Sequence, residues 1–480
     1  MKGIRALGAA VALFALAACQ SKDLQITNPN VVSVAGAAAD PSSVQLLATG
    51  VLNDYRGSRS GFIDQTGRLG RESYIFTPQE GRNTTHYLIG ITVGGQQVLD
   101  PTGFVVGQWG VQYNALRDNK NFRSAAAAAT TLSAAQKSAA LGFARTLEAA
   151  ELLEVIATRD TIGAIVELKD VASDLAAFVS RDSVYKYILA TLDAGSTALA
   201  AGGAAFPFNL HSGFAGFNTP TTFNLFNRAL KARASAYYAT SGGGATAWQG
   251  ALTAIGASFI NAAAATPAAF NAGPFQPYAP SPDSPNPLNQ INNTDLYAHA
   301  SIVTDAQSKA DGTPDNRLSA KIRSGLPSRQ GPISNNSPTS ATSTLGFSIW
   351  ANNTAPIPII RNEELILLRA EGKLATGDKA GAIADLNIVR TGSGGLPAST
   401  LTAANSTDEV LSGILYEKRY SLLMEGHRWV DMRRYGRLSS LPLDISSGPN
   451  KNFVAKVMPI PQAECLVRAN ATGALKGPGC

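Results

Sequence analysis

Apolar residues recur at helical spacing through the middle of the chain, and this pattern constrains the fold more than any other feature of the sequence. Ala149, Leu152, Leu153 and Ile156 follow the i, i+3, i+4, i+7 spacing that places side chains on one face of a helix. The segments 184–192 and 223–237 repeat the pattern, whereas alternating strand patterns are sparse. The sequence therefore predicts a mainly α-helical protein, and its 45% hydrophobic content is enough for a sizeable core.

A helix–turn–helix pair is expected near residue 377. An apolar stripe over 367–374 stops at a Thr-Gly-Asp break, and apolar residues resume over 380–384. Gly377 suits the left-handed position that follows a helix, and Asp378 can cap the next helix. Helix pairs of this kind stack in tetratricopeptide (TPR)-like scaffolds.

Two long irregular regions, 266–299 and 324–360, interrupt the helical patterns. Repeated prolines forbid a continuous helix in the first, and the second is rich in Ser, Asn, Pro and Gly. Loops of this length in a compact protein are usually functional or disordered. Aromatic side chains in turn-rich segments could present flat faces to a ligand, or could instead pin the loops to the core. The candidates for ligand contact are Tyr87, Phe275, Tyr278, Tyr297 and Trp350.

The N-terminus reads as an export signal over residues 1–18, with Lys2 and Arg5 before an apolar run that is too short to span a bilayer. The signal ends in Leu-Ala-Ala-Cys, which resembles the bacterial lipobox and implies cleavage before Cys19 and acylation of that residue. More than one acyl chain gives stable attachment to a membrane. Residues 19–30 would then be a polar tether. The alternative is an ordinary secretory signal with a chance cysteine.

The other two cysteines, Cys465 and Cys480, lie 15 residues apart near the C-terminus. An exported protein meets an oxidising compartment, so we expect a disulfide between them, with two free thiols as the alternative. No histidine lies near these cysteines, and the four histidines of the chain are scattered, so the sequence predicts no metal site and no cofactor. The net charge of +6 is spread along the chain, which argues against a nucleic-acid partner.

The segment 414–434 reads ILYEKRYSLLMEGHRWVDMRR, and segments 358–365, 382–390 and 459–464 carry further motifs. These stretches resemble the RagB/SusD family of surface nutrient-binding lipoproteins. Met424, Lys418 and Asn362 depart from the usual family pattern. The residues that match the main family signature are Glu417, Arg419, Glu425, Gly426, His427, Arg428, Trp429, Asp431 and Arg434.

The resemblance implies a SusD-like fold, in which TPR-like helix pairs form a scaffold with long loops packed on it. Residues 31–265 would be an N-terminal helical region and 266–480 a C-terminal region with the long loops. It also implies lipid attachment at the outer membrane, facing the medium, over a TonB-dependent SusC-like transporter. There the protein would deliver glycan or other polymer fragments, with no cofactor.

Glu425, His427 and Asp431 lie within seven residues and invite a catalytic interpretation. A glycosidase, however, needs two carboxyl groups facing each other across a sugar in a cleft. Charge pairing at i, i+3 is the better account, joining Glu425 to Arg428 and Asp431 to Arg434.

We expect Gly426 to let the chain turn, Trp429 to pack inward, and His427 to be a hydrogen-bonded structural residue. Motifs for a serine nucleophile, a zinc helix or a phosphate loop are absent from the sequence. The sequence therefore predicts a binding protein and not an enzyme. A TPR-like envelope scaffold that binds only proteins is the main alternative, and a glycoside hydrolase is a weaker one.

Overall fold

The structure, a computed structural model, describes residues 41–480 with the exception of 172–173, 281–282, 291 and 331–340. The expected signal peptide, the tether and Cys19 lie outside the described residues.

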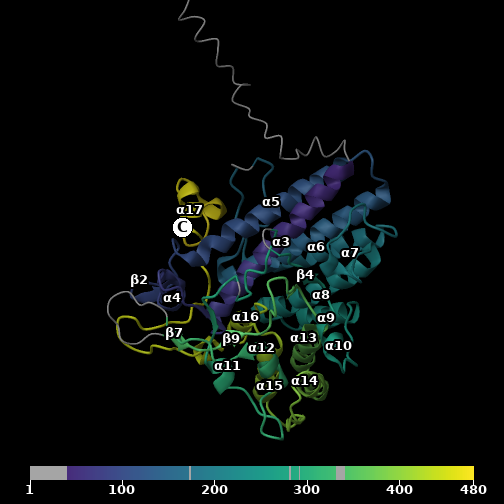
Figure 1. Cartoon of the computed structure of the whole chain (residues 1–480). Helices are drawn as coiled ribbons and strands as arrows, with labels where there is room; N and C mark the ends of the chain where they lie inside the picture. The colour runs from purple at the N-terminus through teal and green to yellow at the C-terminus, as the bar shows by residue number, and fades with distance from the viewer. Residues whose placement is uncertain (1–40, 172–173, 281–282, 291, 331–340) are drawn as a thin grey trace, which may run out of the picture.

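Long helices make up the N-terminal half, and each packs against the next one along the chain (Figure 1). Helix α6 begins with a capping box formed by Ser133 and Gln136, and α8 begins at Thr219 with Pro220 in its first turn. The helices are α3 (Pro41–Leu69), α5 (Gly107–Ala128), α6 (Ala134–Arg159), α7 (Arg181–Ala200), α8 (Pro220–Tyr238) and α9 (Gly244–Gly256).

The apolar stripes form the buried faces of these helices. Ala149, Leu152, Leu153 and Ile156 are all buried in α6, and the stripe over 223–237 is buried in α8. In α7 the stripe is buried except at Tyr187, which is half-buried. The prediction of a mainly helical, SusD-like architecture is confirmed.

The C-terminal half adds α13 (Asn362–Ala375), α14 (Lys379–Gly392), α15 (Thr407–Ser421) and α16 (Arg428–Arg434). The expected turn is present: Gly377 has a φ of +94°, and the Asp378 side chain accepts a hydrogen bond from the Gly381 N–H at 2.8 Å. In α14, however, the buried face is formed by Ala382, Ile383, Leu386 and Val389, whereas Ala380 and Ala384 are exposed. Because α13 packs on both α8 and α9, one core runs through the two regions predicted from the sequence.

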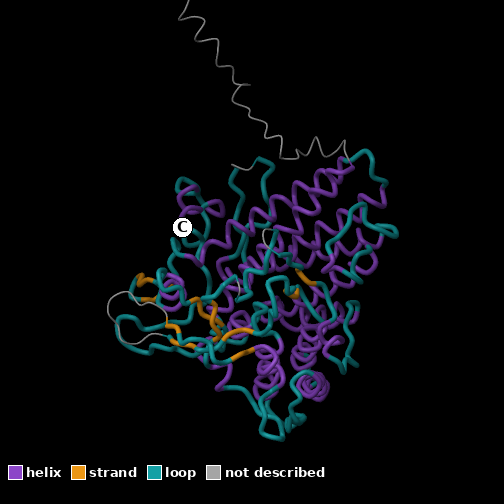
Figure 2. The backbone as a smooth tube through the Cα atoms, viewed as in Figure 1, coloured by secondary structure: helices purple, strands orange, loops and turns teal. Residues whose placement is uncertain are grey.

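Short strands and short helices lie in the connections, and most of the strands lie on the left of the view, whereas β4 (Phe275–Gln276) and α10 (Pro267–Asn271) lie apart from them (Figure 1 and Figure 2). The strands form antiparallel pairs: β1 (Ser73–Ile75) with β5 (Leu296–Ala298), β2 (Ile91–Val93) with β3 (Gln96–Val98), β10 (Ile357–Pro358) with β4 (Phe275–Gln276), β6 (Ile322–Arg323) with β9 (Gly346–Phe347), and β7 (Arg329–Gln330) with β8 (Thr342–Ser343). The short helices are α4 (Arg82–Leu88), α10 (Pro267–Asn271), α11 (Ser301–Thr304), α12 (Asn316–Lys321) and α17 (Gln462–Val467). Much of 266–360 is thus irregular chain laid against the helices.

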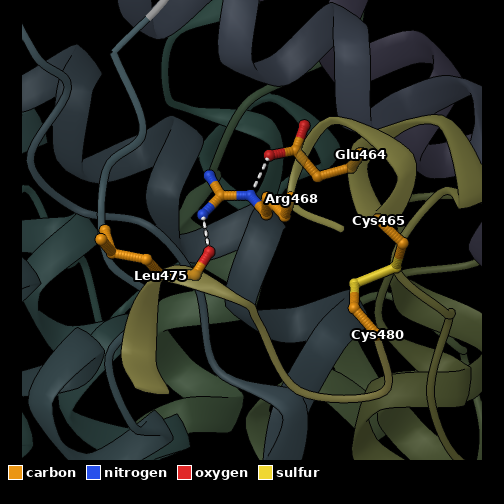
Figure 3. The surroundings of a disulfide bond; sticks show 5 residues. All are labelled: Glu464, Cys465, Arg468, Leu475 and Cys480. Carbon is orange, nitrogen blue, oxygen red and sulfur yellow. Dashed lines mark hydrogen bonds and ion pairs between the residues drawn. A yellow bond between two sulfur atoms is a disulfide. The ribbon is translucent and has the colours of Figure 1, made fainter. Parts of the chain in front are cut away.

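The C-terminal segment is closed by a disulfide between Cys465 and Cys480 (Figure 3). Inside this loop the Arg468 guanidinium donates to the Glu464 carboxylate and to the Leu475 carbonyl, both at 2.6 Å. Within the described residues, no helix combines the length and the apolar character needed to cross a membrane.

Candidate ligand-binding surface

Glu425 of the C-terminal signature is buried and paired with a residue that lies far from it in the sequence. The Arg361 Nη2 atom, just before α13, lies 2.7 Å from Glu425 Oε1, and Arg361 also pairs with Glu363. The expected pair between Glu425 and Arg428 is wrong. Gly426 has a φ of +86°, and this turn separates Glu425 from α16, so the i, i+3 geometry of a helix does not apply.

His427 bridges two helices. Its Nδ1 atom lies 3.1 Å from the Tyr237 hydroxyl of α8, and its Nε2 atom lies 3.5 Å from the Glu364 carboxylate of α13. Arg233 binds the same carboxylate through two hydrogen bonds of 2.6 Å. Burial acts to raise the pKa of Glu364, but Arg233 and His427 outweigh it and hold that pKa well below its ordinary value. His427 therefore has the structural position expected from the sequence.

Asp431 belongs to a buried cluster of four charges. Its carboxylate lies 2.7 Å from Arg434, as expected, and 2.9 Å from Lys418. Glu371 of α13 pairs with the same two cations, each at 2.5 Å. Removal of one member would leave an uncompensated buried charge, which is strongly destabilising.

Two further charged residues of the signature, Glu417 and Arg419, are paired as well. Glu417 lies 2.6 Å from Arg317 and 2.9 Å from Arg390, which ends the 382–390 segment. Arg419 pairs with Asp305 at 2.7 Å. The signature and the two preceding motifs are thus separate in sequence but in contact in space.

The signature forms a structural junction and not a cleft. Trp429 is fully buried, as expected, and its Nε1 donates to the Ala455 carbonyl at 2.8 Å. Glu425 and Asp431 are 6% and 2% exposed, so neither carboxylate faces a substrate. Across the described ranges of the chain, no three His, Cys, Asp or Glu side chains gather so that they could hold a metal ion.

A surface hollow of about 400 Å³ lies where the two long irregular regions meet. Strand β6 pairs with β9, which places Arg323 and Phe347 beside the chain around residue 290. The volume is within the range of small-molecule sites, roughly 300–1,000 Å³. The lining residues are Asn289, Gln290, Arg323, Phe347, Ser348, Trp350 and Ala351.

The polar side of this hollow is held in place by hydrogen bonds. The exposed Arg323 guanidinium donates to Gln290 Oε1 from Nε at 3.1 Å and from Nη2 at 2.6 Å. Its Nη1 and the hydroxyl of Ser348 have no partner among the residues that the structure describes, and both are free to meet a ligand.

The apolar side is formed by Phe347 and Trp350, whose ring centroids lie 5.8 Å apart at an angle of 56°. The Trp350 carbonyl accepts a hydrogen bond from Asn289 Nδ2 at 2.6 Å, which ties the two irregular regions together. Trp350 is 4% exposed and packs in the core, so only a small part of it lines the hollow.

The structure does not bring the five candidate aromatic residues together as one platform. Tyr87 is covered by the Arg68 guanidinium, which lies 4.4 Å from the centre of its ring. Tyr297 is buried beside Phe76, and its hydroxyl donates a hydrogen bond to the Pro327 carbonyl. Neither ring presents a face to solvent, because each fills a gap between a loop and the core.

Phe275 and Tyr278 are half-buried. Phe275 lies in β4, and the Tyr278 ring packs under Arg56 at 5.8 Å. No sequence signal pointed to Arg323 or Gln290, because the residues of the hollow come from three separate segments with no common spacing.

Comparisons with known proteins support the motifs and the fold independently. Residues 283–472 match the model of the SusD family. The comparison with curated proteins produced no match.

Solved structures share the fold at low sequence identity. A SusD-like carbohydrate binding protein from Bacteroides fragilis NCTC 9343 is 16% identical, with a TM-score of 0.64, and the alignment covers 89% of this chain and 98% of that one. A SusD superfamily protein from Bacteroides vulgatus ATCC 8482 is 13% identical, with a TM-score of 0.62 and coverages of 89% and 97%. Surface glycan-binding protein A from Bacteroides fluxus is 16% identical, with a TM-score of 0.61 and coverages of 90% and 99%. The signature and the matched segment thus identify residues 283–472 as a SusD family region, in a chain whose fold as a whole is SusD-like.

Proposed function

We propose that this protein is a cell-surface binding lipoprotein that captures glycan fragments without cleaving them and passes them to a TonB-dependent SusC-like transporter. The observation that carries the proposal is the hollow at Arg323 and Trp350, in a chain with a SusD family region. Two of the similar solved structures are described as carbohydrate- or glycan-binding proteins, which supports the ligand class.

The chemistry of the hollow fits a sugar. A sugar ring has C–H faces that pack on apolar surface and hydroxyl groups that need polar partners at its edge. Phe347 and Trp350, which are 3% and 4% exposed, supply a small apolar area, and Arg323 and Ser348 supply hydrogen-bonding groups beside it. A few placed polar groups next to apolar surface are typical of small-molecule sites.

Binding tests the proposal directly. The full chain is titrated by calorimetry with malto-, xylo-, fructo- and manno-oligosaccharides of four to six residues, and each mixture is then chromatographed for products. We expect saturable binding of at least one oligosaccharide with no products. Arg323→Ala should weaken it roughly tenfold or more, because a hydrogen bond to a charged group contributes about 1.5–3 kcal/mol.

The matched control is Arg437→Ala. Arg437 also donates to a neutral side chain, Ser412 at 2.8 Å, but lies outside the hollow, so its loss should leave affinity unchanged. Product formation would refute capture without cleavage. Failure to bind any oligosaccharide would refute glycan capture and favour the protein-binding scaffold.

Attachment and partnership have their own test. Cys19→Ala should move the full chain from the membrane fraction to the soluble fraction, because the anchor is covalent lipid. Cys480→Ala, which removes a cysteine from the other end of the chain, should not. Wild-type protein purified gently from outer membranes should carry a TonB-dependent barrel, and repeated absence of such a barrel would contradict the delivery step.

A further inference from the structure

A second hollow, of about 300 Å³, lies in the N-terminal helices, on a part of the chain that the family signature does not include. It is bounded by α5, α6 and α7 and by the segment 166–168 (Figure 1 shows these helices side by side). The residues that matter here are Leu116, Lys120, Arg123, Glu148, Leu168 and Tyr187.

Three side chains from three helices meet at Glu148. The Tyr187 hydroxyl of α7 donates to Glu148 Oε1 at 2.7 Å, and the Arg123 Nη1 of α5 donates to Glu148 Oε2 at 2.6 Å. Glu148 is 8% exposed, so its carboxylate is held in one place before any ligand arrives. The half-buried Tyr187 is also the one member of the α7 stripe that does not enter the core.

The trio keeps hydrogen-bonding capacity. A carboxylate oxygen can accept two hydrogen bonds, and each Glu148 oxygen accepts one here. A guanidinium has five N–H donors, of which Arg123 uses one on Glu148. Paired acceptors and donors of this kind suit the neighbouring hydroxyl groups of a sugar.

The hollow is lined by two cations, Lys120 and Arg123, and by two carboxylates, Glu148 and Glu167, so its own charges balance. Arg123 is neutralised by Glu148, and Lys120 lies 2.7 Å from Asp170 while it donates to the Leu168 carbonyl. A strongly charged ligand therefore gains little from this site. Leu116 and Leu168 form an apolar wall beside Arg123, Glu148 and Tyr187. This combination favours a neutral ligand that has both apolar and hydroxylated faces.

The hollow continues beyond Arg123. A neighbouring hollow of about 200 Å³ shares Arg123 and is otherwise lined by Ala126, Ala127, Lys137, Ser138 and Leu141. The two hollows adjoin at Arg123 along α5, and together we call them the groove.

We infer that this groove, centred on Arg123, Glu148 and Tyr187, is a second binding site for neutral saccharides, separate from the hollow at Arg323. The inference takes its ligand class from the proposed function. Two sites on one chain would hold two segments of one glycan, so that affinity rises with glycan length.

The test uses the full chain and the same malto-, xylo-, fructo- and manno-oligosaccharides, with calorimetric stoichiometry and hydrogen exchange as readouts. We expect two sites per chain. Glu148→Gln should weaken one of them roughly tenfold or more and should remove ligand-induced protection of the segment 164–170. Tyr187→Phe keeps the ring and should weaken the same site to a smaller degree.

Tyr238→Phe is the matched control. Tyr238 also donates its hydroxyl to a carboxylate, Asp182 at 2.7 Å, but lies outside the groove, so neither site should change. Because Glu148→Gln removes charge from a buried side chain, its unfolding curve is recorded first, and Tyr187→Phe carries the test if that variant does not fold.

The possible results separate the two proposals. One site that is lost in Arg323→Ala and intact in Glu148→Gln and Tyr187→Phe overturns the groove and leaves the proposed function standing. A site lost only in the groove variants supports the groove and overturns the role of the Arg323 hollow. Failure of every oligosaccharide to bind overturns both.

Discussion

Gly426→Ala should destabilise the protein far more than Gly436→Ala, although the two glycines flank the same short helix, α16. Both have left-handed backbone, with φ of +86° and +68°. A left-handed conformation costs an L-residue about 1–2 kcal/mol, and the loss of unfolded-state freedom on replacing glycine offsets about 0.4–1 kcal/mol of that. Gly436→Ala should therefore lower the free energy of unfolding by about 1 kcal/mol or less, because nothing lies within 4 Å of the new Cβ.

At Gly426 a steric cost adds to the backbone cost. A Cβ there would lie 2.4 Å from Phe62 Cε1 and 2.9 Å from Phe62 Cδ1. Phe62 is 5% exposed and fixed in the core, and overpacking of a core typically costs 1–3 kcal/mol. The expected loss for Gly426→Ala is therefore about 2–4 kcal/mol, of which about 1–3 kcal/mol belongs to the contact with Phe62.

Urea unfolding of both variants, in the wild-type chain and in a Phe62→Leu background, measures this difference. The smaller side chain at position 62 should narrow the gap between the two glycine variants. Equal losses for the two variants, or a gap that Phe62→Leu leaves unchanged, would refute the role assigned to Phe62.

Three further predictions concern buried charge and the disulfide. Glu425→Ala should lower the free energy of unfolding by about 3–5 kcal/mol, because Arg361 loses one of its two buried carboxylate partners. Glu80→Ala breaks an exposed pair and should change the free energy of unfolding by less than about 1 kcal/mol in urea unfolding. Burial raises the pKa of Glu72 to about 8. The folded protein therefore keeps this proton at pH values where the unfolded chain has already lost it, and wild-type stability falls as pH rises towards 8. Glu72→Gln has no such proton to lose, so its stability relative to wild type should increase between about pH 4.5 and 8, by at most about 1.4 kcal/mol per pH unit. If the difference in free energy of unfolding between the variant and wild type stays constant across that range, this reasoning is contradicted. Cys480→Ser should speed hydrogen exchange over 473–480, because a disulfide across a loop of this size contributes roughly 3 kcal/mol of stability. Exchange over 174–178 should also be faster, because the Phe178 N–H donates to the Ala474 carbonyl. Unchanged exchange in both segments would mean that Arg468 alone holds the C-terminal segment in place.

The helical scaffold could be predicted because its signals are local. The i, i+3, i+4 spacing in α6 and α8 decides which face is buried wherever the neighbouring helix lies, and Gly377 and Asp378 define a turn from adjacent residues alone. The same local reasoning failed at Glu425 and Arg428, because an i, i+3 pair needs a continuous helix and the turn at Gly426, with its positive φ, interrupts it.

The candidate site was less predictable. Tyr87 and Tyr297 were chosen because they lie in turn-rich segments, but an aromatic ring in a loop can cover the core as well as face solvent, and composition does not distinguish the two. Arg323 was missed because only the pairing of β6 with β9 brings it beside Gln290.

The sequence by itself determined the helical class, the turn at Gly377 and the SusD family region, because each depends on residues that are close together along the chain. Only the tertiary structure decided which charges neutralise each other, as when Arg361 binds Glu425 and Glu364 binds His427. It also decided where hollows open between segments, as at Arg323 and at Glu148. The physical reason is that ion pairing and cavity shape depend on distances in space between residues far apart in sequence, and these distances are fixed when the helices pack.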